Sequence, residues 1–128
     1  MSHRARVLCI DDEPGVVELI SLILKSQNVQ VDGANSGREG LESMRKDPPD
    51  AVLLDIMMPE MDGFQTLKNI RSNTDLSGIP IYAVTAKAMV GDKEIILKHG
   101  FNDYIPKPVN ATIISSKIEQ LFSKIKLK

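Results

Sequence analysis

The sequence of 128 residues has a single cysteine, no tryptophan, no excess charge of either sign and no long apolar run. Cys9 cannot form an internal disulfide, which fits a reducing compartment, and its apolar neighbours predict a buried thiol. Sixteen basic and seventeen acidic residues give a formal charge of -1, so no overall field favours nucleic acid or an anionic membrane. No stretch approaches the roughly 20 apolar residues needed to cross a bilayer, and no signal peptide is recognisable. We therefore expect a soluble, cytoplasmic protein with no membrane or direct nucleic-acid binding.

Short apolar runs alternate with longer segments of helical spacing. The length is that of one domain, and 42% hydrophobic with 26% charged residues is typical of a folded chain. The apolar runs predict strands at 6–10, 29–34, 51–54, 81–85 and 103–105. The spacing predicts helices at 14–27, at 64–71, between Gly91 and Gly100, and from 113 to the end. A further helix is predicted to open at a capping box formed by Ser36 and Glu39 and to run through Met44.

Strands that alternate with helices predict the α/β class, with a doubly wound parallel sheet and helices on both faces. In such sheets, ligands bind beyond the carboxyl ends of the strands. The residues at those ends are therefore the candidate functional residues. They are Asp11 and Asp12 after the first strand, Asp55 after the third, Thr85 and Ala86 after the fourth, and Lys107 and Pro108 after the fifth.

Each of these residues alone has an ordinary structural interpretation, such as a helix-capping acid or a surface lysine. Together they predict a site. If the first and third strands are neighbours, three carboxylates converge, and like charges at that range need a cation between them. Carboxylate oxygens without nearby histidine or thiolate ligands favour Mg²⁺. Three aspartates, one lysine and Mg²⁺ are formally neutral together, so the combination suits a phosphoryl group carried on a carboxylate.

The same motifs closely resemble the receiver domains of two-component response regulators, the CheY-like family. The resemblance covers nearly the whole chain, which we expect to form one receiver domain at 1–128 with its core at about 6–122. It rests on Asp11-Asp12, on Asp55 within Leu53-Leu54-Asp55-Ile56-Met57-Met58-Pro59 with Asp62-Gly63 following, on Val84-Thr85-Ala86, and on Lys107-Pro108. It implies the flavodoxin-like (βα)5 fold, five parallel strands in the order 2-1-3-4-5.

By this resemblance the chain is a phosphoacceptor regulatory domain and not an enzyme, although it assists its own phosphorylation and dephosphorylation. A phosphohistidine of a sensor kinase or a histidine phosphotransfer protein is the implied donor. The phosphoryl group switches the surface of the fourth helix, fifth strand and fifth helix, which controls a partner or output. The resemblance implies that Asp55 is the phosphoacceptor and that Asp11, Asp12, Asp55 and the backbone carbonyl of Met57 bind Mg²⁺. Lys107, which precedes a cis Pro108, and Thr85 would contact the phosphoryl oxygens. Thr85 and Tyr104 would form the switch pair.

Further expectations concern phosphate lifetime and docking. Met57 and Lys87 occupy the positions that influence how water reaches the phosphate, and we expect these long side chains to slow dephosphorylation. Val16, Ile20 and Val109 are candidate contacts for the phosphodonor, with core packing the alternative for Ile20. A monomer or a weak phosphorylation-dependent dimer is expected.

Three alternatives share parts of this pattern. A Mg²⁺-dependent phosphohydrolase of the haloacid dehalogenase type also uses a strand-end aspartate, but it requires a second aspartate where this chain has Met57. A flavodoxin-like electron carrier shares the fold class, but 4% aromatic residues leave little to stack on a flavin. A receiver-like binding module that takes no phosphate would not need all five site positions.

Overall fold

The computed structural model describes residues 5–86 and 90–125, with the side chains at 90, 91 and 125 left out. Strands and helices alternate along this part of the chain. The strands are β1 (Ala5–Ile10), β2 (Val29–Ala34), β3 (Ala51–Asp55), β4 (Ile81–Thr85) and β5 (Asp103–Pro106). The helices are α1 (Pro14–Lys25), α2 (Gly37–Lys46), α3 (Gly63–Ser72), α4 (Val90–Lys98) and α5 (Ala111–Ile125).

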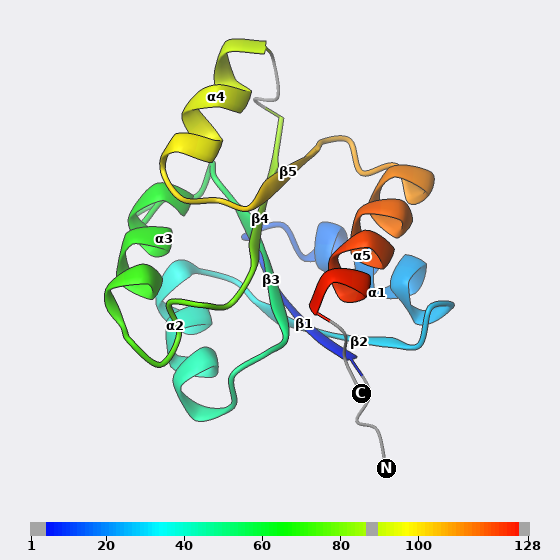
Figure 1. Ribbon diagram of the computed structural model, residues 1–128, viewed down its shortest axis with the longest axis horizontal. Helices are drawn as coiled ribbons and strands as arrows, with labels where there is room; N and C mark the ends of the chain where they lie inside the picture. Colours follow the sequence, from blue (N-terminus) through cyan, green and yellow to red (C-terminus); the bar gives the residue numbers. More distant parts are fainter. Residues whose placement is uncertain (1–4, 87–89, 126–128) are drawn as a thin grey trace.

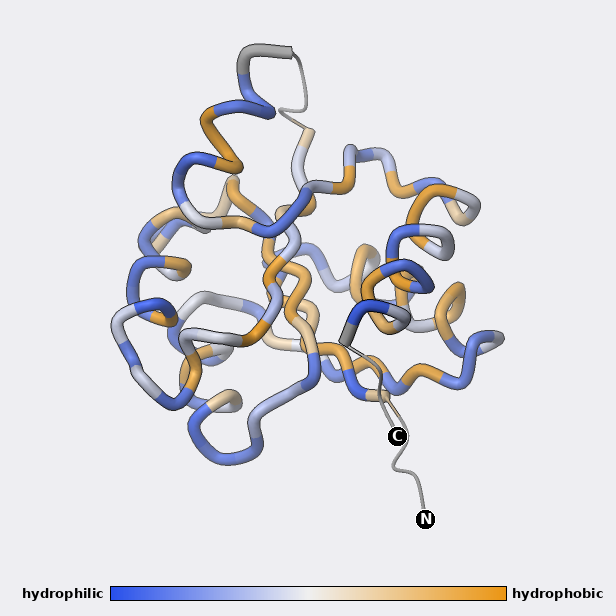
Figure 2. The backbone as a smooth tube through the Cα atoms, in the orientation of Figure 1, coloured by the Kyte–Doolittle hydropathy of each residue, from blue (hydrophilic) through white to orange (hydrophobic). Residues whose placement is uncertain are grey.

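The five strands form one parallel sheet in the order β2-β1-β3-β4-β5, as predicted. Helices α2, α3 and α4 cover one face of the sheet, and α1 and α5 cover the other (Figure 1). The central strands β1, β3 and β4 are nearly continuous apolar runs, because helices cover them on both sides. Figure 2 shows these strands as the most hydrophobic part of the chain, with hydrophilic segments around them.

The sheet separates two apolar clusters. One packs Leu8, Leu54 and Ile81 against α2, α3 and α4, and the other packs Leu53 and Ile118 with α1 and α5. The side chains alternate between the clusters along each strand, as the strand period of two requires. Cys9 belongs to the second cluster, and burial, with the nearby charge of Asp11, raises the pKa of its thiol to about 12. The predicted buried thiol is confirmed.

Local sequence features, such as an N-terminal proline or a capping residue, determine where most of the helices begin. Pro14 opens α1 in the first turn, where its missing N–H costs nothing. The Ser36 side chain accepts a hydrogen bond from the N–H of Glu39, so the predicted cap of α2 is confirmed. A full capping box, which the sequence analysis did not identify, opens α3 between Asp62 and Gln65.

Several helix bounds differ from the prediction by one or two residues, and two of these differences have a visible local cause. α1 ends at Lys25, two residues early, because the chain tightens into a turn in which Gln27 N–H bonds the Leu24 carbonyl, and Asn28 then takes a left-handed φ of 60°. α5 begins at Ala111, two residues early, because the Asn110 side chain accepts a hydrogen bond from the N–H of Ile113. Among the described residues, no helix is both long enough and apolar enough to span a membrane.

Candidate functional site

The predicted carboxylates lie together at the carboxyl end of the sheet. β1 and β3 are neighbours, with Ile10 opposite Leu54, so the residues that follow, Asp11 and Asp55, leave their strands side by side. Asp12 comes next in the chain, and its carboxylate reaches the same place. The sheet therefore brings together the three aspartates that the sequence singled out.

A fourth carboxylate joins the cluster. Asp11, Asp12, Glu13 and Asp55 each contribute an oxygen to a group whose atoms all lie within 4.8 Å of one another. Asp11 and Asp55 are buried, at 1% and 2% exposure, whereas Asp12 and Glu13 are exposed. The cluster is thus a buried pair of carboxylates with an opening to solvent on the side of the exposed pair.

Backbone hydrogen bonds orient the two buried carboxylates. Asp11 Oδ1 accepts from the N–H of Glu13 at 2.9 Å, and Asp55 Oδ1 accepts from the N–H of Met57 at 3.0 Å. The other oxygen of each carboxylate faces Lys107, whose Nζ lies 3.1 Å from Asp11 Oδ2 and 3.4 Å from Asp55 Oδ2. The same Nζ donates a hydrogen bond of 3.1 Å to Glu13 Oε1. One ammonium therefore contacts three carboxylates.

The electrostatics of the cluster follow from burial and from this shortage of cations. Burial raises the pKa of Asp55, the charge of Asp11 raises it further, and the Met57 N–H and Lys107 offset part of the effect. Burial alone would lower the pKa of Lys107, but its close contacts with the carboxylates of Asp11 and Glu13 outweigh burial and raise it. Lys107 is therefore charged at neutral pH, and four carboxylates against one ammonium leave a formal charge of -3.

These residues fit a Mg²⁺ ion. All four side chains offer hard oxygen ligands, which Mg²⁺ prefers. Asp11 Oδ2 is buried and, within the described part of the chain, accepts no hydrogen bond despite its ion pair with Lys107. A buried carboxylate oxygen in that state is open to a metal ligand bond. Glu13 makes the cluster more acidic than the three aspartates counted from the sequence, so the neutral sum expected there becomes -1 with the ion.

Thr85 and Lys107 are brought together by the pairing of β4 with β5. The N–H of Lys107 donates to the carbonyl oxygen of Thr85 at 2.9 Å, and Thr85 is fully buried at the end of β4. Ala83 lies opposite Tyr104 in the register, so Thr85, two residues on, points to the same face of the sheet as Tyr104. The Lys107–Pro108 peptide bond is cis, as the resemblance implied.

The loop after β3 folds back onto the backbone of the acidic site. The N–H of Gly63 donates to the carbonyl oxygen of Ile56 at 2.9 Å. A Cβ at Gly63 would lie 2.5 Å from the Ile56 Cα and 2.6 Å from the Asp55 carbonyl oxygen. Glycine is required here because any side chain would push the loop away from the backbone of Asp55 and Ile56.

The other predicted residues differ in how far they are buried, and one of them lies outside the described residues. The side chain of Met57 is 55% exposed beside Asp55, while Lys87 lies outside the described residues. Ile20 is fully buried in the core, so the packing alternative holds for it, and Val16 and Val109 are half-buried against the same cluster. The exposed apolar side chains of α1 are Leu19 and Leu22, which sequence reasoning missed.

Glu13 is the site residue that sequence reasoning missed. The signal was present, since Glu13 follows Asp12 directly, but its partner Lys107 is 94 residues away. An acidic residue before Pro14 also has an ordinary helix-end interpretation.

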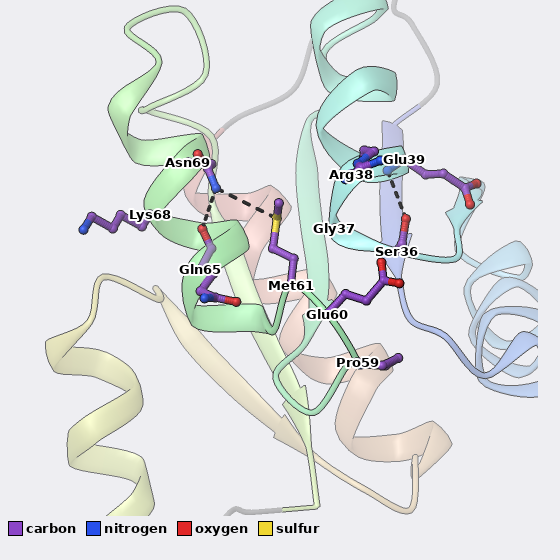
Figure 3. A pocket seen from close by; sticks show the side chains of 10 residues that line it. All are labelled: Ser36, Gly37, Arg38, Glu39, Pro59, Glu60, Met61, Gln65, Lys68 and Asn69. Atoms are coloured by element: carbon purple, nitrogen blue, oxygen red, sulfur yellow. Dashed lines mark hydrogen bonds between the residues drawn. The ribbon is translucent and has the colours of Figure 1, made fainter.

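A large groove lies away from this cluster (Figure 3). It measures about 790 Å³ and runs between the start of α2, the loop after β3 and the outer face of α3. Arg38, Glu39, Glu60 and Lys68 line it together with uncharged residues, and none of its lining residues is a predicted site residue. This groove is therefore separate from the candidate site at the carboxyl end of the sheet.

Comparison with known proteins gives the same family throughout. The sequence model described as the response regulator receiver domain matches residues 7–119. Response regulator MprA of Mycobacterium leprae is 36% identical over 121 residues, which is 94% of this chain and 52% of MprA. Sensor histidine kinase GacS of Pseudomonas protegens is 38% identical over 114 residues, which is 86% of this chain and 12% of GacS.

A solved structure shares the fold. Chemotaxis protein CheY4 of Vibrio cholerae superimposes with a TM-score of 0.86 at 26% identity, over 93% of this chain and 99% of that one. The chain spans about half the length of MprA and a small part of GacS. Since the family match covers nearly all of the sheet and its helices, the chain belongs to the response regulator receiver domains, the phosphoacceptor domains of two-component signal transduction.

Proposed function

We propose that Asp55 is the residue that takes the phosphoryl group. Asp55 ends β3, its Oδ1 is held by the Met57 N–H, and its Oδ2 faces the ammonium of Lys107. In the transfer step a carboxylate oxygen of Asp55 forms a bond to phosphorus, the bond from phosphorus to the histidine nitrogen of the donor breaks, and that nitrogen keeps the electron pair. The product is an acyl phosphate, which water later hydrolyses.

Receiver domains bind Mg²⁺ at an acidic pocket, and here Asp11, Asp12 and Asp55 with the backbone carbonyl of Met57 would hold it. The ion would neutralise charge on the cluster and on the phosphoryl oxygens. The support from this chain is the hard oxygen donor set and the buried Asp11 oxygen that accepts no hydrogen bond among the described residues.

Lys107 and Thr85 serve the phosphoryl group directly in this proposal. Lys107 exchanges part of its contact with the carboxylates for a phosphoryl oxygen, and the Thr85 hydroxyl donates to another. Because these contacts neutralise negative charge on the phosphoryl oxygens during both transfer and hydrolysis, the chain assists its own phosphorylation and dephosphorylation. Met57, exposed beside Asp55, and Lys87 limit the access of water to the acyl phosphate.

The donor in this proposal is a sensor histidine kinase or a histidine phosphotransfer protein. GacS is named a sensor histidine kinase and contains a segment similar to this chain, which supports such a partner. The output is a change in the face formed by α4, β5 and α5, driven by Thr85 and Tyr104. We expect the unit to act as a cytoplasmic monomer or a weak phosphorylation-dependent dimer, with the domain at 1–128 and its core at about 6–122.

The observation that carries the proposal is Asp55 Oδ2 held in the buried cluster next to Lys107. The test is incubation with a small acyl phosphate and Mg²⁺, followed by mass measurement. We expect one added phosphoryl group on the wild type and on Asp75→Asn, a control in an exposed turn, and none on Asp55→Asn. Removing Mg²⁺ with a chelator should abolish the labelling. Phosphate on Asp55→Asn, or rapid turnover of small phosphate esters, would contradict the proposal and favour the phosphohydrolase alternative.

A further inference from the structure

Two ammonium groups lie close to the ring of Tyr104. Lys93 Nζ is 5.7 Å from the ring centroid, and Lys117 Nζ is 5.4 Å from it. Both distances are within the range in which a cation is attracted to the electron-rich face of an aromatic ring. Each lysine belongs to a different helix, since Lys93 lies on α4 and Lys117 on α5.

Tyr104 is placed so that it can join these two helices. It lies on β5, the last strand of the sheet, is half-buried and packs against the apolar cluster under α2, α3 and α4. Lys117 reaches it from α5, on the opposite face of the sheet. The ring therefore sits at the sheet edge, where the two helical layers meet.

Asp103 fixes one of the two lysines. Its Oδ2 forms a 2.9 Å ion pair with Lys117 Nζ, and its Oδ1 accepts a hydrogen bond from the N–H of Tyr104 at 2.8 Å. One carboxylate thus ties the cation of Lys117 to the backbone of the residue whose ring that cation contacts. Lys117 is largely covered, at 25% side-chain exposure, whereas Lys93 is exposed.

We propose that Lys93 and Lys117 are positioning residues that hold the Tyr104 ring between α4 and α5, and so set how readily the ring moves when Asp55 is phosphorylated. The inference rests on the proposed function, in which Tyr104 is half of the switch pair. It adds two residues to the switch that neither contact the phosphoryl site nor belong to the predicted site.

Two positions of the Tyr104 ring compete with each other. In the position seen here, two cation–π contacts favour the ring, and any position away from the sheet edge gives up one or both. At exposed sites each such contact changes an equilibrium by about two- to fivefold. Removing the cations therefore raises the population of the displaced ring before any phosphate is present, and makes phosphorylation more favourable by linkage.

The chain suits a direct measurement, because it has two tyrosines and no tryptophan. Incorporating 3-fluorotyrosine gives one fluorine NMR signal from Tyr82 and one from Tyr104, and Tyr82→Phe assigns them. The signal of Tyr104 is recorded before and after phosphorylation with a small acyl phosphate and Mg²⁺. Mass measurement on the same samples reports phosphate on Asp55 independently.

The variants have matched controls on the same helices. Lys93→Met and Lys117→Met remove the cations but keep a flexible helix-forming side chain. Lys98→Met on α4 and Lys124→Met on α5 remove the same charges from lysines for which no contact with the Tyr104 ring is found in the described structure. Lys93→Arg and Lys117→Arg keep the cation. Asp103→Asn removes the ion pair but leaves both cations and an oxygen for the Tyr104 N–H.

We expect the Tyr104 signal of the double methionine variant, without phosphate, to lie closer to the phosphorylated wild-type position. The ratio of phosphorylated to unphosphorylated Asp55 at a fixed donor concentration should rise about two- to fivefold per lysine removed. The Lys98 and Lys124 controls and the arginine variants should resemble the wild type. Asp103→Asn, which frees Lys117 from its ion pair, should move the Tyr104 signal in the same direction as the double variant but less far. An unchanged Tyr104 signal in the double variant, or the same shift in the lysine controls, would overturn the inference. If the wild type takes no phosphate on Asp55, the proposed function fails, while the signals of the unphosphorylated variants still decide the role of the lysines.

Discussion

The ammonium of Lys107 donates a 3.1 Å hydrogen bond to Glu13, which adds a fourth carboxylate to a site expected to hold three. The pair joins residues 94 positions apart in the sequence. In the proposed function, Glu13 would therefore compete with the phosphoryl group for Lys107 and, at the same time, add negative charge that attracts Mg²⁺. These two effects have opposite consequences for phosphorylation and can be measured separately.

Glu13→Gln should weaken Mg²⁺ binding while leaving phosphorylation at saturating Mg²⁺ unchanged or faster. The side chain of Glu13 is 65% exposed, so we expect the dissociation constant for Mg²⁺ to rise by only about two- to fivefold. Isothermal titration calorimetry gives that constant, and a small acyl phosphate gives the rate. Glu18→Gln, an exposed acid on α1, is the control and should change neither. Slower phosphorylation of Glu13→Gln at saturating Mg²⁺ would mean that Glu13 does more than compete for Lys107.

Asp55→Asn should stabilise the fold at neutral pH without Mg²⁺. Burial, with the charge of Asp11, raises the pKa of Asp55 in the fold. The unfolded chain therefore loses this proton first as pH rises, and the free energy of unfolding falls between the ordinary carboxyl pKa and the raised one. We expect a gain of about 1 kcal/mol from urea unfolding at neutral pH, shrinking as pH is lowered through the acidic range. A gain independent of pH would refute the electrostatic cause, and Asp75→Asn serves as the reference.

Gly63→Ala should destabilise the protein by about 2 kcal/mol and slow phosphorylation. Its Cβ would meet backbone atoms of Ile56 and Asp55, which cannot move aside as a side chain can. Gly15→Ala is the matched control, because nothing lies within 4 Å of its Cβ and alanine favours a helix by about 0.5–1 kcal/mol. Thermal and urea unfolding measure both variants. Equal stabilities for the two would show that the loop has room to relax.

Replacing Met57 with asparagine and Lys87 with glutamate should shorten the lifetime of the acyl phosphate. Met57 is 55% exposed and follows Asp55 by two residues, and in the proposed function its long side chain limits the access of water, which a shorter polar group would leave open. The decay of phosphorylated protein, followed by mass after donor removal, gives the lifetime, and each single replacement separates the two contributions. An unchanged lifetime in the double variant would remove both residues from the mechanism.

The fold could be predicted from the sequence because its strands are short apolar runs with clear ends. The strands at 29–34 and 81–85 have the predicted bounds, since Asn28 and Asn35 flank the first and Pro80 precedes the second. The acidic cluster could be predicted because parallel strands end at one edge, which brings Asp11 and Asp55 together. These inferences need the local pattern, the direction of the strands and the strand order that the family resemblance implies.

The remaining details depend on side-chain geometry that no pattern contains. α1 is apolar on nearly every side, so its spacing could not separate buried Ile20 from exposed Leu22. The ion pair of Glu13 with Lys107 and the two lysines around Tyr104 depend on where flexible side chains lie across separate elements. Sequence spacing predicts which elements meet, but not which of their long polar side chains find each other.

The burial of Cys9 has a practical consequence for spectroscopy. A thiol enclosed in the second cluster, with a pKa of about 12, stays protonated and shielded from alkylating dyes while the protein is folded. A new cysteine placed on the outer surface of α4 or α5 would therefore accept a fluorophore or spin label alone. Movements of that face could then be followed by site-specific probes with the native thiol left in place.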